Sequence, residues 1–190
     1  MHHTYSYFYC LFPIPYCLQI IYKPKCCAKI YIYNPPKIVT YKESNLGITI
    51  KYPQSWQRQD IGNIFTKELV KFLSLLGKQD NFEEKVVLSI EDYPGSLEQS
   101  KDDFTKEINK ALSAAEIIET TPITLGFKPA FKIIYTGKDE EKNLNLKNLQ
   151  IWTLKANKAY IITYTAEQKD YDKFLPELKN MIKTFEISEQ

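Results

Sequence analysis

Two clusters of acidic residues are the side chains of this sequence whose types and spacing could do chemistry. Carboxylate oxygens grouped in this way are ligands for hard cations such as calcium and manganese. The members are Glu98, Asp102 and Asp103 in the first cluster, and Asp139, Glu140 and Glu141 in the second. These six residues are the candidates for a metal site.

The surroundings of both clusters argue against a bound cation. Glu98 and Asp102 are four residues apart in a segment with helical periodicity, where they would share the polar outer face of a helix. Lys138 and Lys142 flank the second cluster and would compete with a cation. Neither cluster has the alternating acidic spacing and the glycine of a dedicated calcium loop. We therefore predict no resident metal or other cofactor.

Residues for common catalytic sites are missing from most of the chain. His2 and His3 are the only histidines, and the last of the four cysteines is Cys27. Beyond residue 27, no serine or cysteine nucleophile can therefore be paired with an imidazole base. The six glycines form no phosphate-binding loop. A hydrolase that uses a pair of carboxylates stays open as an alternative, but we expect the protein not to be an enzyme.

The charge of the chain gives no sign of nucleic-acid binding. It contains 25 basic and 23 acidic residues, for a formal net charge of +2. Arg58 is the only arginine, although arginine is the residue that pairs best with phosphate and with guanine. We expect a protein partner and no nucleic acid.

Residues 1–37 differ in composition from the rest of the chain. They hold all four cysteines, both histidines and five of the ten prolines, and the first acidic residue is Glu43. The cysteines lack the paired Cys-x-x-Cys spacing of structural zinc sites. Pro13 and Pro15 interrupt the apolar run that a signal peptide or a transmembrane helix would need. We predict a poorly ordered leader at 1–37, either native or read from an upstream start, and one domain at 38–190.

Localisation follows from the same segment. With no recognisable signal peptide or lipoprotein motif, a cytoplasmic protein is expected. Contact of the leader with a membrane surface is left open, because tyrosines and lysines together suit an interface.

The hydrophobic pattern of residues 38–190 indicates several strands and two helices. Between Ile64 and Leu76 the pattern fits a helix as well as a buried strand. Ala156-Asn157-Lys158 is typical of a tight hairpin turn. Trp56 and Trp152 are expected in the core. The segments with strand character are 48–52, 85–90, 117–125, 127–135, 146–154 and 159–165.

Capping residues and proline define the two helices. Ser96 with Gln99 has the spacing of an N-terminal cap, and a second helix is expected between Asp170 and Phe185, with a kink or a late start because of Pro176. Hairpin-like strand pairs with separate helices predict the α+β class, with a mostly antiparallel sheet covered by helices. The apolar face of the first helix is expected to contain Leu97, Phe104, Ile108, Ala111, Leu112 and Ala115.

Three passages resemble the PsbP-like family. They are YKESNLGITIKYPQSW at residues 41–56, QIWTLKANKAYIITYTA at 150–166 and MIKTFEI at 181–187. Residues 86–92 and 135–138 fit the family pattern in order. The resemblance implies an α/β/α sandwich around an antiparallel sheet, and it favours a strand at Leu69 to Leu73. Calcium or manganese is implied by the resemblance only.

The passage Phe65 to Ser74 looks closest to the PsbP-like domain at the C-terminus of cyanobacterial serine/threonine kinases, although this chain contains no kinase motif. Other members of the family are the extrinsic protein of photosystem II, its assembly-factor relatives and a Ran-binding relative. We therefore expect a non-catalytic binding or sensory module related to, or separated from, a kinase parent. The alternative is an extrinsic or assembly accessory protein of photosystem II. Because no signal peptide or lipoprotein motif is recognisable, we expect a cytoplasmic protein rather than a thylakoid-associated one.

Overall fold

The computed structural model describes residues 6–9, 17–21, 29–33, 36–62, 67–74 and 82–188. The chain divides into two units, Met1–Lys37 and Ile38–Gln190. In the first unit, three short strands pair antiparallel in the order β1-β2-β3. These strands are β1 (Ser6–Tyr9), β2 (Cys17–Ile21) and β3 (Lys29–Tyr33). That this segment is a poorly ordered leader stays a prediction.

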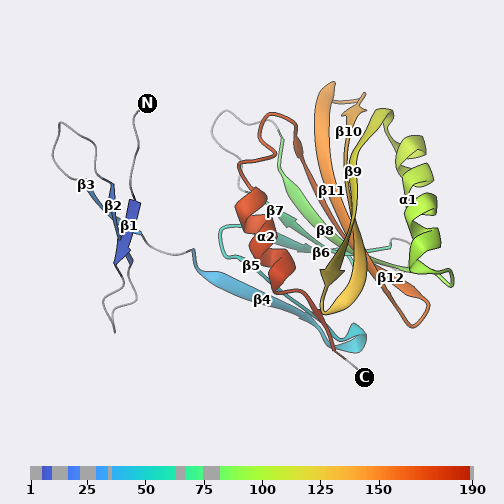
Figure 1. Ribbon diagram of the computed structural model, residues 1–190, viewed down its shortest axis with the longest axis horizontal. Coiled ribbons are helices and arrows are strands. Elements are labelled where there is room, and N and C mark those ends of the chain that lie inside the picture. Colours follow the sequence, from blue (N-terminus) through green and yellow to red (C-terminus); the bar gives the residue numbers. More distant parts are fainter. Residues whose placement is uncertain are drawn as a thin grey trace. The chain divides into compact units, whose positions relative to one another are not determined.

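The second unit is built on a seven-stranded sheet in the order β6-β7-β8-β12-β11-β10-β9 (Figure 1). All neighbouring strands are antiparallel, as the sequence predicts. Their bounds are β6 (Gln57–Asp60), β7 (Glu68–Leu73), β8 (Lys85–Asp92), β9 (Ser113–Leu125), β10 (Lys128–Asp139), β11 (Leu144–Lys155) and β12 (Lys158–Glu167).

Strand β7 resolves the ambiguous segment in favour of a strand. Its side chains alternate, with Val70 and Phe72 buried on one face of the sheet. The flanking residues 63–66 and 75–81, which include Ile64, Phe65 and Leu76, lie outside the described residues.

A small second sheet and helix α2 (Leu175–Lys183) cover one face of the large sheet (Figure 1). The small sheet has the order β13-β5-β4. Its elements are β4 (Ile38–Glu43), the 3-10 helix η1 (Ser44–Leu46), β5 (Ile48–Pro53) and β13 (Glu186–Ile187). Pro176 is the second residue of α2, a position where its missing N–H costs no hydrogen bond. The predicted late start is therefore confirmed.

Helix α1 (Leu97–Ala111) packs against the opposite face of the large sheet (Figure 1). The Ser96 hydroxyl accepts a hydrogen bond from the backbone N–H of Gln99 at 3.1 Å, so the predicted cap is confirmed. The helix ends at Ala111, because Leu112 is already extended. The placement of Ala115 on the helix face is therefore wrong, and Ala115 lies in β9. Among the described residues, no helix is long and apolar enough to cross a membrane.

The alternation of side chains along the central strands produces two cores. On β12, Tyr160 and Ile162 point toward α2 and the small sheet, whereas Ala159 and Ile161 point toward α1. Because both faces of the sheet are covered, these strands bury nearly every side chain. Trp152 has no exposed surface, which confirms its predicted place in the core.

Candidate functional site

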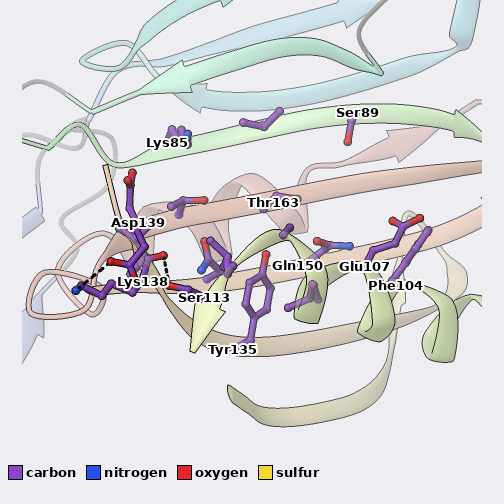
Figure 2. Close-up of a pocket in the computed structure, with 18 of the residues that line it drawn as sticks. Lys85, Ser89, Phe104, Glu107, Ser113, Tyr135, Lys138, Asp139, Gln150 and Thr163 are labelled. Carbon is purple, nitrogen blue, oxygen red and sulfur yellow. Dashed lines mark hydrogen bonds and ion pairs between the residues drawn. The ribbon is translucent and has the colours of Figure 1, made fainter. Parts of the chain in front are cut away.

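A cavity of about 730 Å³ lies beside α1, on the sheet face that α1 covers (Figure 2). Its floor is formed by β8, β12, β11 and β10, and one wall by the second half of α1. A further part of its lining comes from the turn between β10 and β11. This volume falls in the range of small-molecule binding sites.

A row of polar side chains crosses the floor of the cavity. Lys85 pairs with Thr165 in the β8–β12 register, Thr165 with Asn148 in the β12–β11 register, and Asn148 with Tyr135 in the β11–β10 register. Directly paired residues of antiparallel strands project from the same face. All four therefore meet at one end of the cavity, and all four line it.

A second row lies two residues further along the same strands. There Val87 pairs with Thr163, and Thr163 with Gln150. Figure 2 shows the side chains of Thr163 and Gln150 on the floor between Lys85 and the helix wall. The floor thus presents hydroxyl, amide and ammonium groups where the centre of a sheet normally carries apolar side chains.

Asn148 is the least expected member of the floor. Its side chain is buried, with 3% of the residue exposed. Its amide nitrogen Nδ2 has no hydrogen-bond partner among the described residues. An unpaired buried donor costs about 1–3 kcal/mol, so nearly all such groups in proteins have a partner. The unpaired N–H groups are therefore a position where a ligand atom can be bound.

Lys85 is the cation of the same row, on the other side of Thr165 from Asn148. Burial lowers the pKa of Lys85 below its ordinary value, and the nearby Lys71 lowers it further. Glu68 and Asp139 act in the opposite direction with smaller effect. Lys85 forms no ion pair within the described part of the chain, so its ammonium group is available to a ligand.

Tyr135 and Glu107 complete the polar lining. Burial raises the pKa of Tyr135 to about 12, so its hydroxyl is neutral at pH 7 and can donate a hydrogen bond. Figure 2 shows this hydroxyl directed toward the cavity. Glu107 projects from α1 at the opposite end of the cavity from Lys85 (Figure 2). It has no hydrogen bond or ion pair with another described residue.

The structure separates the two predicted acidic clusters. Asp139, Glu140 and Glu141 line the cavity, at the end of β10 and in the turn that follows. Ser113 Oγ donates to Glu140 Oε1 at 2.6 Å, and Lys138 Nζ lies 3.2 Å from Glu140 Oε2. Both contacts lower the pKa of Glu140, the Ser113 hydrogen bond most.

The first cluster lies on α1 outside the cavity lining. Lys101 Nζ lies 3.6 Å from Glu98 Oε2 and 4.0 Å from Asp102 Oδ1, and Lys106 Nζ lies 3.5 Å from Asp103 Oδ1. The three carboxylates of this cluster are thus ion-paired with lysines of the same helix. Within the described ranges, no three His, Cys, Asp or Glu side chains are grouped so as to hold a metal ion.

Sequence reasoning missed the floor of the cavity. The available signal was the spacing of Asn148 and Gln150, which share one face of their strand, matched by Thr163 and Thr165 in the next strand. Such polar positions indicate a face that is not closed by a helix. Only the strand register shows that they meet Lys85.

Comparison with known proteins gives the class of protein to which this fold belongs. The PsbP-like protein family matches residues 34–187, and the chain is a member of that family. No curated protein sequence matches the chain.

Solved structures with the same fold come from distant organisms. Cyanobacterial PsbP (CyanoP) from Synechocystis sp. PCC 6803 superposes with a TM-score of 0.61 at 16% identity, over 82% of this chain and 95% of that one. LpqN, involved in cell envelope biogenesis of Mycobacterium tuberculosis, superposes with a TM-score of 0.58 at 11% identity, over 82% of this chain and 93% of LpqN. The Ran-binding protein Mog1p of Saccharomyces cerevisiae superposes with a TM-score of 0.51 at 9% identity, over 80% of this chain and 96% of Mog1p. These similarities show the fold.

Proposed function

We propose that this protein is a non-catalytic binding module whose ligand occupies the cavity beside α1. The unpaired Nδ2 of the buried Asn148 is the observation that carries the proposal. A bound acceptor would satisfy this donor and pair with the ammonium group of Lys85. Neither group has a protein partner among the described residues.

The chemistry of the lining supports binding over catalysis. A carboxylate that acts as a general acid needs a raised pKa, whereas hydrogen bonding to Ser113 and Lys138 lowers the pKa of Glu140. Asp139 Oδ1 accepts a hydrogen bond from the backbone N–H of Lys142 at 3.1 Å, which orders the turn. Both carboxylates have structural partners, and this argues against a hydrolase that uses this pair.

We propose further that ligand binding is read out through a protein partner in the cytoplasm. A serine/threonine kinase parent is the partner suggested by the resemblance of Phe65 to Ser74, of which Phe65 and Thr66 lie outside the described residues. An in-frame kinase domain beside this chain in genomic DNA supports that link, and its absence from the genome removes it.

A photosystem II accessory role is the second candidate. The similarity to cyanobacterial PsbP favours it. Fractionation of the native cells distinguishes the two roles, since an accessory protein is recovered with thylakoid membranes. Recovery only in the soluble fraction removes this candidate.

The binding proposal is tested by NMR on the ¹⁵N-labelled full chain. The probes are mixtures of carboxylic acids, amines, amino acids, sugars and nucleotides. We expect at least one mixture to shift the side-chain amide signals of Asn148 and Gln150, and Asn148→Leu to abolish the shift at Gln150. Asn109→Leu, on the exposed part of α1, is the matched control. If no mixture moves these signals, the proposal is wrong.

A further inference from the structure

Four hydrogen-bond donors of the cavity gather at one end. Lys85 offers an ammonium group, Asn148 an unpaired amide N–H, and Tyr135 and Thr165 offer hydroxyl groups. Such a set matches an oxyanion, because a carboxylate accepts several hydrogen bonds and pairs with a lysine. The cross-strand register holds these groups in one row, so the site is formed without movement of the backbone.

The rest of the lining has the opposite charge. The cavity lining contains two lysines, Lys85 and Lys138, and five carboxylates. The five are Glu68, Glu107, Asp139, Glu140 and Glu141. A ligand that carries only negative charge is therefore repelled by most of the cavity, and one that carries only positive charge is repelled by Lys85.

Glu107 supplies a position for a positive group. Three of the five carboxylates already have partners. Glu140 forms an ion pair with Lys138, and Asp139 accepts a hydrogen bond from a backbone N–H. Glu68 Oε2 lies 2.8 Å from Lys71 Nζ. Glu141, in the turn after β10, and Glu107 have neither a hydrogen bond nor an ion pair within the described residues. Of these two carboxylates, Glu107 is the one on the helix wall. It stands on α1, across the cavity from Lys85 (Figure 2).

We propose that the ligand is a small zwitterion of the amino-acid type, whose carboxylate binds Lys85 and Asn148 while its ammonium group faces Glu107. This inference rests on the proposed function, since it assigns a chemical class to the ligand of the same cavity. Both charges of the ligand then meet a group of opposite sign, and the two unpaired groups of the floor are satisfied. The cavity volume leaves room for the side chain.

Calorimetric titration of the full chain tests the assignment. The probes are the standard α-amino acids, β-alanine, 4-aminobutanoate and glycylglycine, each compared with its N-acetyl derivative and its methyl ester. We expect saturable binding of at least one zwitterion. Loss of either charge of that ligand is expected to weaken binding roughly ten- to a hundredfold.

Variants locate the binding. Lys85→Met should weaken binding of the zwitterion by roughly ten- to a hundredfold and leave the weak binding of its methyl ester unchanged. Glu107→Gln should weaken binding of the zwitterion by the same factor and leave the weak binding of its N-acetyl derivative unchanged. Glu98→Gln, on the part of α1 outside the cavity lining, and Lys179→Met, on the exposed face of α2, are the charge-matched controls and should bind as wild type does.

Four results overturn the assignment. Equal affinity for the N-acetyl derivative identifies an anion site, and equal affinity for the methyl ester identifies a cation site. If no zwitterion binds while another compound class shifts the Asn148 amide signals, the ligand class is wrong and the binding proposal stands. If no compound class shifts those signals, both are wrong.

Discussion

The indole Nε1–H of Trp152 donates a hydrogen bond to the hydroxyl oxygen of Ser100 at 2.8 Å, and neither residue has any exposed surface. Trp152 belongs to β11 and Ser100 to the first half of α1. The Ser100 hydroxyl in turn donates to the backbone carbonyl of Leu97 at 2.6 Å. The hydrogen bond between Trp152 and Ser100 fixes the rotation of α1 on the sheet. It thereby also fixes the position of the helix wall of the cavity.

Ser100→Ala should destabilise the fold by about 1–3 kcal/mol, because the buried indole N–H then has no acceptor. Denaturant unfolding measures the loss. In the Trp152→Phe background the same substitution should cost much less, since no indole donor is left unpaired. If the two substitutions are additive in a double-mutant cycle, the hydrogen bond contributes nothing.

Gly137→Ala should destabilise the fold by about 1–3 kcal/mol, in the manner of an overpacked core. A Cβ at Gly137 would lie 2.8 Å from Leu112 Cδ1 and 2.9 Å from Leu112 Cβ, at the point where the chain leaves α1. Leu112→Ala removes Cδ1, so the double variant should lose less stability than the sum of the two single variants. Thermal unfolding of the four proteins measures this coupling, and strictly additive losses would contradict it.

Phe127→Asn should stabilise the fold by about 1 kcal/mol. Gly126 and Phe127 form the two-residue turn between β9 and β10 with φ of +54° and +63°. This left-handed conformation costs a bulky side chain about 1–2 kcal/mol, and asparagine tolerates it better. Phe127 is 91% exposed, so few contacts are lost. Phe127→Leu retains the strain and should give no gain in the denaturation midpoint; an equal gain would point to aromatic exposure instead.

Lys85→Met should stabilise the protein at pH 7, and the gain should shrink as the pH rises toward 10.5. Burial lowers the pKa of Lys85 in the folded state below its ordinary 10.5, so the unfolded chain binds more protons between these two values. Stability contributed by Lys85 therefore rises with pH through this window. Melting temperatures at pH 7 and pH 10 check the sign, with Lys179→Met as the control. A gain that grows with pH contradicts a buried ammonium group.

Calcium and manganese should produce no saturable rise in melting temperature beyond that of a salt of matched ionic strength. Lysines already pair with Glu98, Asp102, Asp103 and Glu140. A bound ion would stabilise the fold by about 2.7 kcal/mol at a hundredfold excess over its Kd. A shift at micromolar metal that is lost in Asp102→Asn or Glu140→Gln is the contrary result, and it would favour the photosystem role.

Most of the secondary structure and the fold class follow from the sequence alone. Local rules suffice for these features, because alternation of apolar residues specifies a strand, a Ser96-type cap begins a helix, and Pro176 is tolerated only in the first turn of α2. The turn at Ala156 and Asn157 was likewise predictable, and both residues adopt positive φ. The misplacement of Ala115 arose because the apolar spacing continues past the end of α1 into β9.

The tertiary structure alone decided the candidate site. Lys85 and Asn148 are 63 positions apart in the sequence, and neither belongs to a recognisable motif. They lie in one row on the cavity floor because β12, which follows both in the chain, inserts between β8 and β11. Thr165 of β12 then pairs with each of them. The acidic clusters, which the sequence singled out, are divided by the same topology. Sequence spacing records charge along the chain, whereas strand order determines which charges share a cavity.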